Sequence, residues 1–454
     1  MGLERSAAGK WIRNMIFAGA GITDITPRTQ VWMDGMLRAR PSEGVHDSLS
    51  ARALVLSDSH EVARSFVLVT VDVCALDGET TRAVRTGAAL RTGLPASRIV
   101  VAATHTHAGP STVGIFTPRE PLYIEELTGR LIDLIALTAS DTKPVELSFA
   151  SGTEETISHY RRLLADDGHV VMNWVPYPPE HIVGPLGTAD PQVSVVKVEG
   201  QSGVVALVFN HAGHPNVLSG DNYLLSADYP GVAARLLEAE FGGTALFFNG
   251  AQGSVDIDGL RHRDWEGMDR AGYALAQAAS SVARASDPCR SPTFRSASVS
   301  YVLPGRRITD EEWRWAQAIL ETTGGKYDPI ADGVGEDYKA VFYRRLHDAG
   351  PCDLPVEQTC LALGDCALLT FPGELYTEIG LIIKAQSPFR NTCIIGLANG
   401  YIGYVPTRRA ISEGGYVEDT RRVGDAAEEV VLGHSLALLE RVYASSAPAS
   451  SVSG

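Results

Sequence analysis

The feature that most constrains this chain is a repeated junction between an apolar strand and a loop that carries reactive side chains. Runs rich in Val, Ala, Leu and Phe, typical of buried strands, end repeatedly at segments broken by Gly or Pro. The polar side chains in those segments are His105, His214, Asp256, Glu374 and Tyr404. In α/β proteins, ligands bind outside the carboxyl ends of strands, where loops present side chains above a rigid sheet. The recurrence therefore predicts an active site built at strand ends.

Periodicity and turn residues predict an α/β fold of mixed β-sheets flanked by helices. Strands are expected at 17–27, 51–57, 66–75, 99–103, 146–152, 169–173, 193–198, 203–210, 244–249 and 392–398. Helices are expected at 79–92, 121–138, 228–241, 262–285, 308–322, 374–385 and 425–443. A hairpin at 359–371 turns at Gly364-Asp365. No repeat or linker divides the chain, so we expect a lead-in at 1–16, one domain at 17–444 and a disordered tail at 445–454.

Composition restricts the function classes. The 54 acidic residues outnumber the 39 basic residues, for a net charge of −15, which argues against a nucleic-acid partner. No run reaches the length of a membrane span, so membrane insertion is not expected. The chain shows no secretory signal, and its six cysteines contain no Cys-x-x-Cys pair, which favours reduced thiols and a cytoplasmic location. We expect a small-molecule substrate, and homo-oligomerisation is left open.

The most informative short motif is His105-Thr106-His107, which follows the apolar run at 99–103. Alternation along an extended chain places the two imidazoles on one side. Neutral imidazole is the commonest nitrogen ligand of a divalent metal, so the pair predicts a metal site. The alternative is that one or both are hydrogen-bonded core histidines, because short motifs also occur by chance.

Three further candidate ligands each have a structural alternative. His214 follows a strand and is held extended by Pro215, with His211 as its rival. Glu374 follows Pro-Gly at a predicted helix start, where a first-turn acid is common. Tyr404 is typical of aromatic packing, and a phenolate ligand would need the metal to lower its pKa.

Other candidates concern proton transfer and charge. Asp228 is a candidate N-cap, and Asp256 lies in a Gly-rich turn where aspartate is ordinary. Arg161 and Arg162 would usually be solvated. Within a closed site, either arginine could hold a carboxylate or an oxyanion.

Taken in order, these segments resemble the N-terminal catalytic domain of the neutral (non-lysosomal) ceramidase family. They are Gly21-Ile-Thr-Asp-Ile-Thr-Pro27, Thr104-His-Thr-His-Ala-Gly-Pro110, His214-Pro215 followed by Ser226-Ala-Asp228, the Gly-rich turn at 249–256, Pro372-Gly-Glu374, and Tyr401-Ile-Gly-Tyr404-Val with Tyr416 beyond. They occur in the family's order and span roughly 17 to 420. The segment from Thr104 to Pro110 is the most specific.

The resemblance implies a zinc-dependent amide hydrolase with one Zn²⁺ per chain. By position, the zinc ligands are His105, His214, Glu374 and Tyr404. His107 resembles a histidine that contacts the bound water or the substrate, and Tyr416 resembles a second tyrosine at the site. Arg161 stands where the family places an arginine close to the reacting amide.

The chain departs from the family in two places. The family's Gly-Asp-Val-Ser turn, whose serine has been assigned a catalytic role, is here Gly253-Ser254-Val255-Asp256. This favours direct attack by zinc-bound water over a serine nucleophile. The family also carries a C-terminal immunoglobulin-like domain, and this chain ends before one could begin, so long-chain ceramide is not the expected substrate.

Our leading hypothesis is a zinc-dependent hydrolase that cleaves the amide (N-acyl) bond of a small, soluble substrate. Asp256 or Asp228 would carry the proton, and His107 or Arg161 would stabilise the oxyanion. The alternatives are an ester or lactone hydrolase on the same zinc site, and a non-catalytic zinc- or ligand-binding protein. A two-metal phosphoesterase is suggested only by Asp256 and Asp258.

Overall fold

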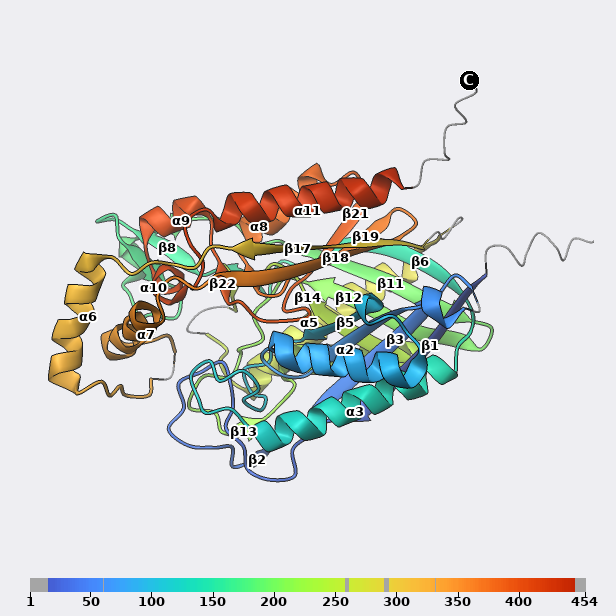
Figure 1. The fold of residues 1–454 in the computed structure, drawn as a ribbon, viewed down its shortest axis with the longest axis horizontal. Coiled ribbons are helices and arrows are strands. Elements are labelled where there is room, and N and C mark those ends of the chain that lie inside the picture. Colours follow the sequence, from blue (N-terminus) through green and yellow to red (C-terminus); the bar gives the residue numbers. More distant parts are fainter. Residues whose placement is uncertain (1–14, 60, 258–260, 290–293, 331, 446–454) are drawn as a thin grey trace, which may run out of the picture.

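The computed structural model describes residues 15–59, 61–257, 261–289, 294–330 and 332–445. The predicted lead-in at 1–16 and tail at 445–454 lie almost entirely outside these residues. The described chain forms four layers in the order helices, large sheet, small sheet, helices (Figure 1). The predicted α/β fold of mixed sheets flanked by helices is confirmed.

The large sheet is mixed. Its strands run in the order β14 (Thr244–Asn249), β12 (Gly203–His211), β11 (Gln192–Gly200), β6 (Lys143–Thr153), β1 (Ile16–Asp24), β3 (Ser50–Ser57), β4 (Phe66–Val71) and β5 (Ile99–Ala103), and β16 (Asp287–Pro288) also pairs with β6. The pairs β12–β14 and β4–β5 are parallel, and the others are antiparallel. Both parallel pairs occupy the ends of the sheet.

Helices cover one face of the large sheet. They are α2 (Gly78–Thr92), α3 (Pro121–Ser140), α4 (Asp228–Phe241) and α5 (Trp265–Arg284). Leu131 of α3 shares a buried cluster with Val69 of β4, and Leu237 of α4 shares another with Phe247 of β14. Burial of these apolar side chains, worth about 1.5–3 kcal/mol each, holds the helices to the sheet.

The small sheet covers the other face. Its order is β17 (Phe294–Leu303), β18 (Leu354–Leu363), β19 (Cys366–Thr370) and β21 (Asn391–Ile395). Leu368 and Ile395 pack in one cluster with Val208 and Leu246 of the large sheet. The outer face is covered by α8 (Thr377–Gln386) and α11 (Ala427–Ala444), which appear along the upper edge of Figure 1.

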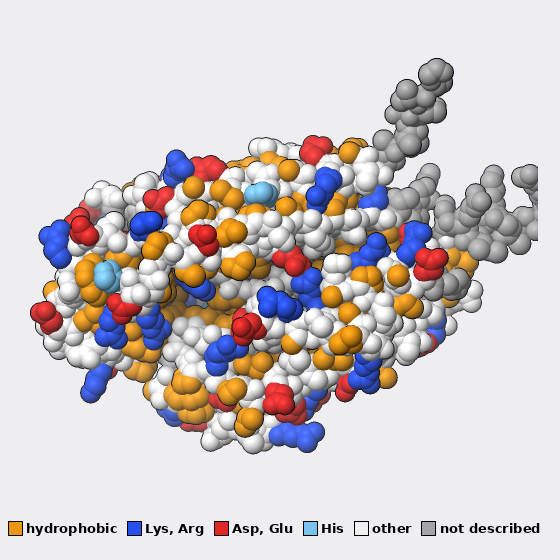
Figure 2. Space-filling model, in the orientation of Figure 1, with side chains coloured by type: hydrophobic (Ala, Val, Ile, Leu, Met, Phe, Trp, Pro, Cys, Tyr) orange, Lys and Arg blue, Asp and Glu red, His pale blue; other side chains and the backbone are white. Residues whose placement is uncertain are grey.

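The remaining elements are short or peripheral. They are β2 (Gly44–Val45), β7 (His159–Tyr160), β8 (Arg162–Ala165), β9 (Val170–Met172), β10 (Ile182–Pro185), β13 (Leu224–Leu225), β15 (Val255–Asp256), β20 (Glu374–Leu375), β22 (Tyr404–Val405), α6 (Asp310–Thr323), α7 (Glu336–Ala349), α9 (Arg408–Glu413), α10 (Tyr416–Thr420) and the 3-10 helices η2 (Val62–Arg64), η3 (Ala96–Arg98) and η4 (Pro179–His181). Figure 2 shows a hollow in the surface between the side formed by α7 and the side formed by α2.

The sequence did not predict several of these elements, including β17 and α7, and some helices begin a few residues later than expected. The hairpin turning at Gly364 and Asp365 is confirmed, but its first strand pairs along its whole length with β17, which the sequence did not indicate. Alternating Ser residues and half-exposed positions weaken the hydrophobic signal of β17. Helix α7 was also missed. Helix α8 begins at Thr377, three residues beyond Glu374.

Two further observations concern the cysteines and the length of the helices. All six cysteines are free, as expected for reduced thiols. Among the helices of the described residues, none combines the length and the apolar character needed to cross a bilayer.

The two sheets are joined directly at the carboxyl ends of their parallel strands. The Gly396 amide donates to the Asn249 carbonyl at 2.9 Å, and the Asn399 amide donates to the Val101 carbonyl at 2.8 Å. The loops after β5, β12, β14, β19 and β21 therefore emerge at one end of the sandwich. This positions the predicted site residues near one another.

Gly19 tests the contact between β1 and α3. A Cβ at this position would lie 2.5 Å from the Thr138 carbonyl oxygen. We expect Gly19→Ala to lower the free energy of unfolding by about 1–3 kcal/mol, because backbone atoms must shift. Gly129, exposed in α3 with open space around it, is the control: Gly129→Ala should stabilise by about 1 kcal/mol. Denaturant unfolding checks both, and equal effects would contradict the packing argument.

Candidate functional site

Three buried side chains converge at the junction of the two sheets. His105 Nε2 lies 3.2 Å from His214 Nε2 and 3.2 Å from Glu374 Oε2. His214 Nε2 lies 4.0 Å from the same Glu374 oxygen. All three side chains are at most 2% exposed. The structure therefore brings together three of the four predicted ligands from three separate loops.

His105 reaches this cluster through a turn of the backbone. Strand β5 ends at Ala103, and His105 has φ of 76°, in the left-handed region that few residues other than glycine adopt. Its amide donates to the Val73 carbonyl at 3.0 Å. The prediction that alternation along an extended strand aligns His105 with His107 is therefore wrong in its geometry, although the two rings do meet.

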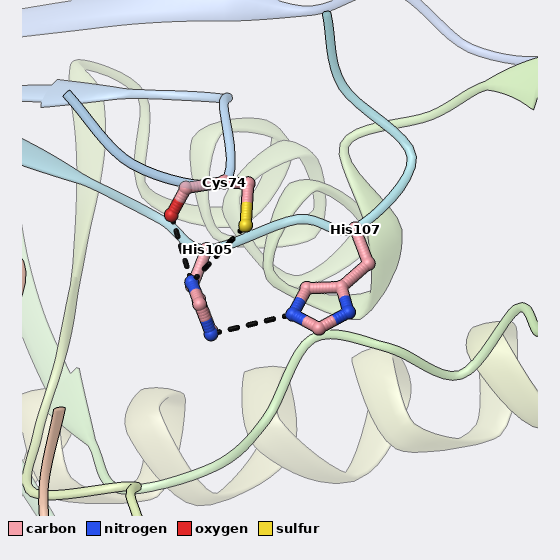
Figure 3. A group of neighbouring side chains, drawn as sticks. All are labelled: Cys74, His105 and His107. Atoms are coloured by element: carbon pink, nitrogen blue, oxygen red, sulfur yellow. Dashed lines mark hydrogen bonds between the residues drawn. The ribbon is translucent and has the colours of Figure 1, made fainter. Parts of the chain in front are cut away.

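The other nitrogen of His105 is fixed by Cys74. His105 Nδ1 donates to the Cys74 carbonyl oxygen at 2.7 Å, and the Cys74 thiol lies 3.6 Å from the same nitrogen. Figure 3 shows the ring between Cys74 on one side and His107 on the other. This hydrogen bond leaves the lone pair of a neutral His105 on Nε2, facing the cluster.

His107 adds a third imidazole. Its Nε2 lies 3.3 Å from His105 Nε2, and its ring packs against Gly35, where a Cβ would come within 2.5 Å of the ring. Arg38 donates to the His107 carbonyl at 2.9 Å and fixes the loop. Burial, together with the nearby His105 and the arginines around it, holds the pKa of His107 well below its usual value. The imidazole is therefore neutral at neutral pH.

His214, not His211, belongs to the cluster. Asn249 holds the loop before His214, because its side chain donates to the Gly213 carbonyl at 2.8 Å. His211 instead contacts Ser158 Oγ at 3.2 Å and the Gln192 carbonyl at 3.3 Å. Burial and the neighbouring imidazoles lower the pKa of His214, so this ring is also neutral at neutral pH.

Glu374 is a strand residue rather than a helix-start acid. It lies in β20, paired in parallel with Tyr404 of β22. Tyr401 donates its hydroxyl to Glu374 Oε1 at 2.9 Å, while Oε2 is buried and has no hydrogen-bond partner. Burial raises the pKa of Glu374, but His105 and Arg161 outweigh it and lower the pKa below its usual value. The side chain is therefore a carboxylate with one oxygen unsatisfied.

These atoms fit a divalent cation. His105 Nε2 and Glu374 Oε2 face each other across 3.2 Å, and Glu374 Oε2 has no hydrogen-bond partner, so a cation between them would bind both atoms. Two ligands at about 2.0–2.1 Å from a tetrahedral zinc ion lie roughly 3.3–3.4 Å apart. Two of the three separations, at 3.2 Å, are close to this spacing, and the third, at 4.0 Å, is longer. The donor set of two imidazoles and one carboxylate also suits zinc.

A narrow cavity of about 30 Å³ lies beside this cluster, with His214 in its wall. Six predicted site residues line it: His107, Arg161, His214, Asp256, Tyr404 and Tyr416. Burial and the nearby Glu374 carboxylate raise the pKa of Tyr404, and burial also raises that of Tyr416. Both phenols therefore keep their protons in the metal-free protein.

Arg161 lies in a box of aromatic rings. Its guanidinium carbon is 4.9 Å from the ring centroid of Tyr404, 5.6 Å from that of Tyr416 and 5.8 Å from that of Trp174. Arg161 Nη2 donates to the Gly253 carbonyl at 2.6 Å. The side chain is buried, yet its Nε has no hydrogen-bond partner.

The two candidate proton carriers differ in position. Asp256 lines the cavity and pairs with Arg263 at 3.3 Å. Asp228 is not among the described residues that line it, and its two oxygens accept amide hydrogens from Tyr229 and Val217. Burial raises the pKa of Asp228 to about 7.

The prediction that Asp228 is the N-cap is wrong: Ala227 takes that position, and Asp228 has φ of 55°. Asp258 lies outside the described residues.

Sequence reasoning missed much of the cavity wall and of the support behind the cluster. The missed wall residues are Gly35, Met36, Phe116, Trp174, Asn216, Asp332 and Gly333. They come from loops without a motif, so no local signal could have found them. Tyr401, which holds Glu374, was visible as part of the Tyr401-to-Tyr404 segment but was assigned no hydrogen bond.

Solved structures share this fold. Neutral ceramidase from Pseudomonas aeruginosa superposes with a TM-score of 0.72 at 19% identity, covering 94% of this chain and 75% of that chain. A ceramidase complexed with C2 superposes with a TM-score of 0.73 at 18% identity, covering 94% and 76%. No protein-family model matches the chain, and no curated protein matches its sequence. The predicted ceramidase-like catalytic-domain fold is confirmed.

Tyr401→Phe tests whether the hydroxyl orients Glu374. Removing the hydrogen bond to Oε1 should weaken zinc binding roughly 10- to 100-fold, because groups that orient a metal ligand contribute that much to affinity. Competition with a chromogenic chelator measures the affinity. Tyr416→Phe, which removes another hydroxyl from the cavity wall, should leave it unchanged. Wild-type affinity in Tyr401→Phe would contradict the orienting role.

Proposed function

We propose that this protein is a zinc-dependent hydrolase that cleaves the amide bond of a small N-acyl substrate. The observation that carries the proposal is the buried cluster of His105, His214 and Glu374, in which Glu374 Oε2 has no hydrogen-bond partner and lies 3.2 Å from His105 Nε2. The fold shared with neutral ceramidase, an enzyme named for amide cleavage, supports the same chemistry. One zinc ion per chain would be held by His105, His214, Glu374 and Tyr404.

When bound, zinc lowers the pKa of water toward about 7 and polarises the scissile carbonyl. The protein residues supply the rest. His107 lines the cavity beside the cluster, where it can orient water or substrate. Arg161 is a buried cation on the same wall and can stabilise negative charge as it develops on the carbonyl oxygen.

Asp256 is the better candidate for moving the proton. It lines the cavity, and one of its oxygens accepts a backbone hydrogen bond from Ile257 while the other pairs with Arg263. These contacts hold the carboxylate in one orientation, which general acid–base catalysis requires. Asp256 would take a proton from water and return it to the leaving amine. Asp228, held by two backbone amides away from the wall, is proposed to be structural.

The polar and aromatic lining of the pocket offers hydrogen-bonding groups close to the cluster, which suits a polar amide. A cytoplasmic location and a soluble substrate remain predictions from the sequence. The same apparatus would open an ester or lactone, so a panel of matched amides and esters decides the bond class.

The metal count tests the site. Protein purified without chelator should contain about one zinc per chain by plasma mass spectrometry, and His105→Ala should lose both zinc and hydrolysis, because it removes the ligand closest to the other two. His211→Asn is the control. His211 is the last residue of β12 and contacts Ser158 outside the cluster, so this variant should keep its zinc. A metal-free wild type, or an active His105→Ala, would contradict the proposal; zinc without turnover would favour the binding-protein alternative.

Paired aspartate variants test the proton carrier. Asp256→Asn should lower kcat by roughly 10²- to 10⁴-fold, the range expected for loss of a general base. Asp228→Asn should change kcat by less than about tenfold, since its contacts are with the backbone. Both are measured with zinc content and melting temperature as controls. The reverse ranking would assign the role to Asp228.

A further inference from the structure

Arg161 carries a positive charge that nothing in the described part of the chain neutralises by an ion pair. It is 2% exposed and lines the cavity. The Arg161 guanidinium donates hydrogen bonds to the Gly253 carbonyl and to the Tyr404 hydroxyl, and both of these groups are uncharged at neutral pH. A guanidinium has five N–H donors, and the Nε donor of Arg161 is buried without a partner. A buried charge in this state is unfavourable unless an anion completes its contacts.

Other buried arginines of the protein are satisfied differently. Arg162, the next residue along the chain, pairs with Glu413 at 2.9 Å. All three guanidinium nitrogens of Arg38 donate to backbone carbonyls. Arg161 combines an unpartnered donor, burial and a place in the cavity wall.

Neither carboxylate of the cavity forms an ion pair with Arg161, although the charge of Asp256 favours its charged form. Asp256 and Asp332 both line the wall, and both pair with Arg263, at 3.3 Å and 3.1 Å. This trio carries a net charge of −1. Both carboxylates are therefore engaged by Arg263 rather than by Arg161.

The aromatic wall does not favour a cationic ligand. Tyr404, Tyr416 and Trp174 would be a suitable cage for a substrate cation, but Arg161 already lies within 4.9–5.8 Å of their centroids. A second cation beside it would be repelled. An anion would be attracted by the same guanidinium.

We propose that Arg161 binds a carboxylate of the substrate, and that the substrate class is small amides bearing a carboxylate within a few bonds of the scissile bond, such as N-acyl amino acids. The inference rests on the proposed amide hydrolysis and deepens it. Guanidinium and carboxylate form paired, charge-assisted hydrogen bonds, which would use the free Nε donor. Arg161 lines the same cavity as His107 and His214, so an anion held by Arg161 lies beside the cluster.

The first experiment compares matched acids and neutral amides. N-acetylglycine is paired with N-acetylglycinamide, and N-methylsuccinamic acid with N-methylsuccinamide, so that the carboxylate stands on the amine side or the acyl side. Release of acetate or methylamine is measured on the zinc-loaded protein. We expect kcat/KM for at least one acid to exceed that of its neutral partner by about 10- to 100-fold, the effect of a hydrogen bond between charged groups. Equal values for both pairs would overturn the inference while leaving amide hydrolysis intact.

Variants of Arg161 separate substrate binding from stabilisation of the oxyanion. Arg161→Gln should remove the preference for the acid mainly through KM, and Arg161→Lys should keep part of it because the charge remains. If Arg161→Gln instead lowers kcat equally for acids and neutral amides, Arg161 acts on the reacting carbonyl only, and the inference is wrong. Zinc content and melting temperature are checked for each variant.

A binding measurement makes the test independent of turnover. Calorimetry on chelator-treated wild-type protein should detect N-acetylglycine binding at least about tenfold tighter than N-acetylglycinamide, and Arg161→Gln should abolish the difference. Without metal, a carboxylate cannot gain affinity by coordinating zinc. Preference for the acid in binding with no hydrolysis of any amide would sink the proposed function but keep the carboxylate site. No preference in wild type would overturn the carboxylate site.

Discussion

The site depends on one buried contact: His105 Nε2 and Glu374 Oε2 lie 3.2 Å apart, and Glu374 Oε2 has no hydrogen-bond partner. Nδ1 of His105 is occupied by the Cys74 carbonyl, and Tyr401 reaches only the other oxygen of Glu374, so Nε2 and Oε2 both face the cluster. A divalent cation at this point would be coordinated by both atoms. The arrangement is therefore informative about function, since His105, His214 and Glu374 place three ligand atoms close enough to share one ion.

The surrounding scaffold holds this contact in place with strained backbone and dedicated hydrogen bonds. His105, Leu397 and Asn399 all adopt positive φ, at 76°, 55° and 60°, and each such residue costs on the order of 1–3 kcal/mol. These three residues lie at the junction where the sheets meet, and Asp228 and His262 also adopt positive φ elsewhere in the described residues. Asn249 and Asn399 link loops across that junction through side-chain and backbone hydrogen bonds. Packing between the sheets, well away from the site, offsets the strain.

The cavity contains two arginines, Arg263 and Arg161, whose contacts differ. Arg263 is held by Asp256 and Asp332 and neutralises most of the wall. Arg161 is held by aromatic rings and a carbonyl, which position it without cancelling its charge. Aspartate at 256, where the sequence departs from the ceramidase turn, is thus part of an ion-pair network rather than an isolated replacement. The network gives the cavity a polar, compact character.

The sequence alone determined the buried strands and the places where they end, because both are local: buried strands need continuous apolar runs, and Gly or Pro must follow where they stop. It therefore predicted the mixed α/β layers and the loops that carry His105, His214 and Glu374. It could not choose between His211 and His214, place Asp228 away from the wall, or find Trp174 and Asp332. Those outcomes depend on which loops meet when the two sheets pack and on a left-handed turn at His105 that reverses the expected alternation. Contacts between segments hundreds of residues apart leave no periodic trace in the chain, so only the tertiary structure decided them.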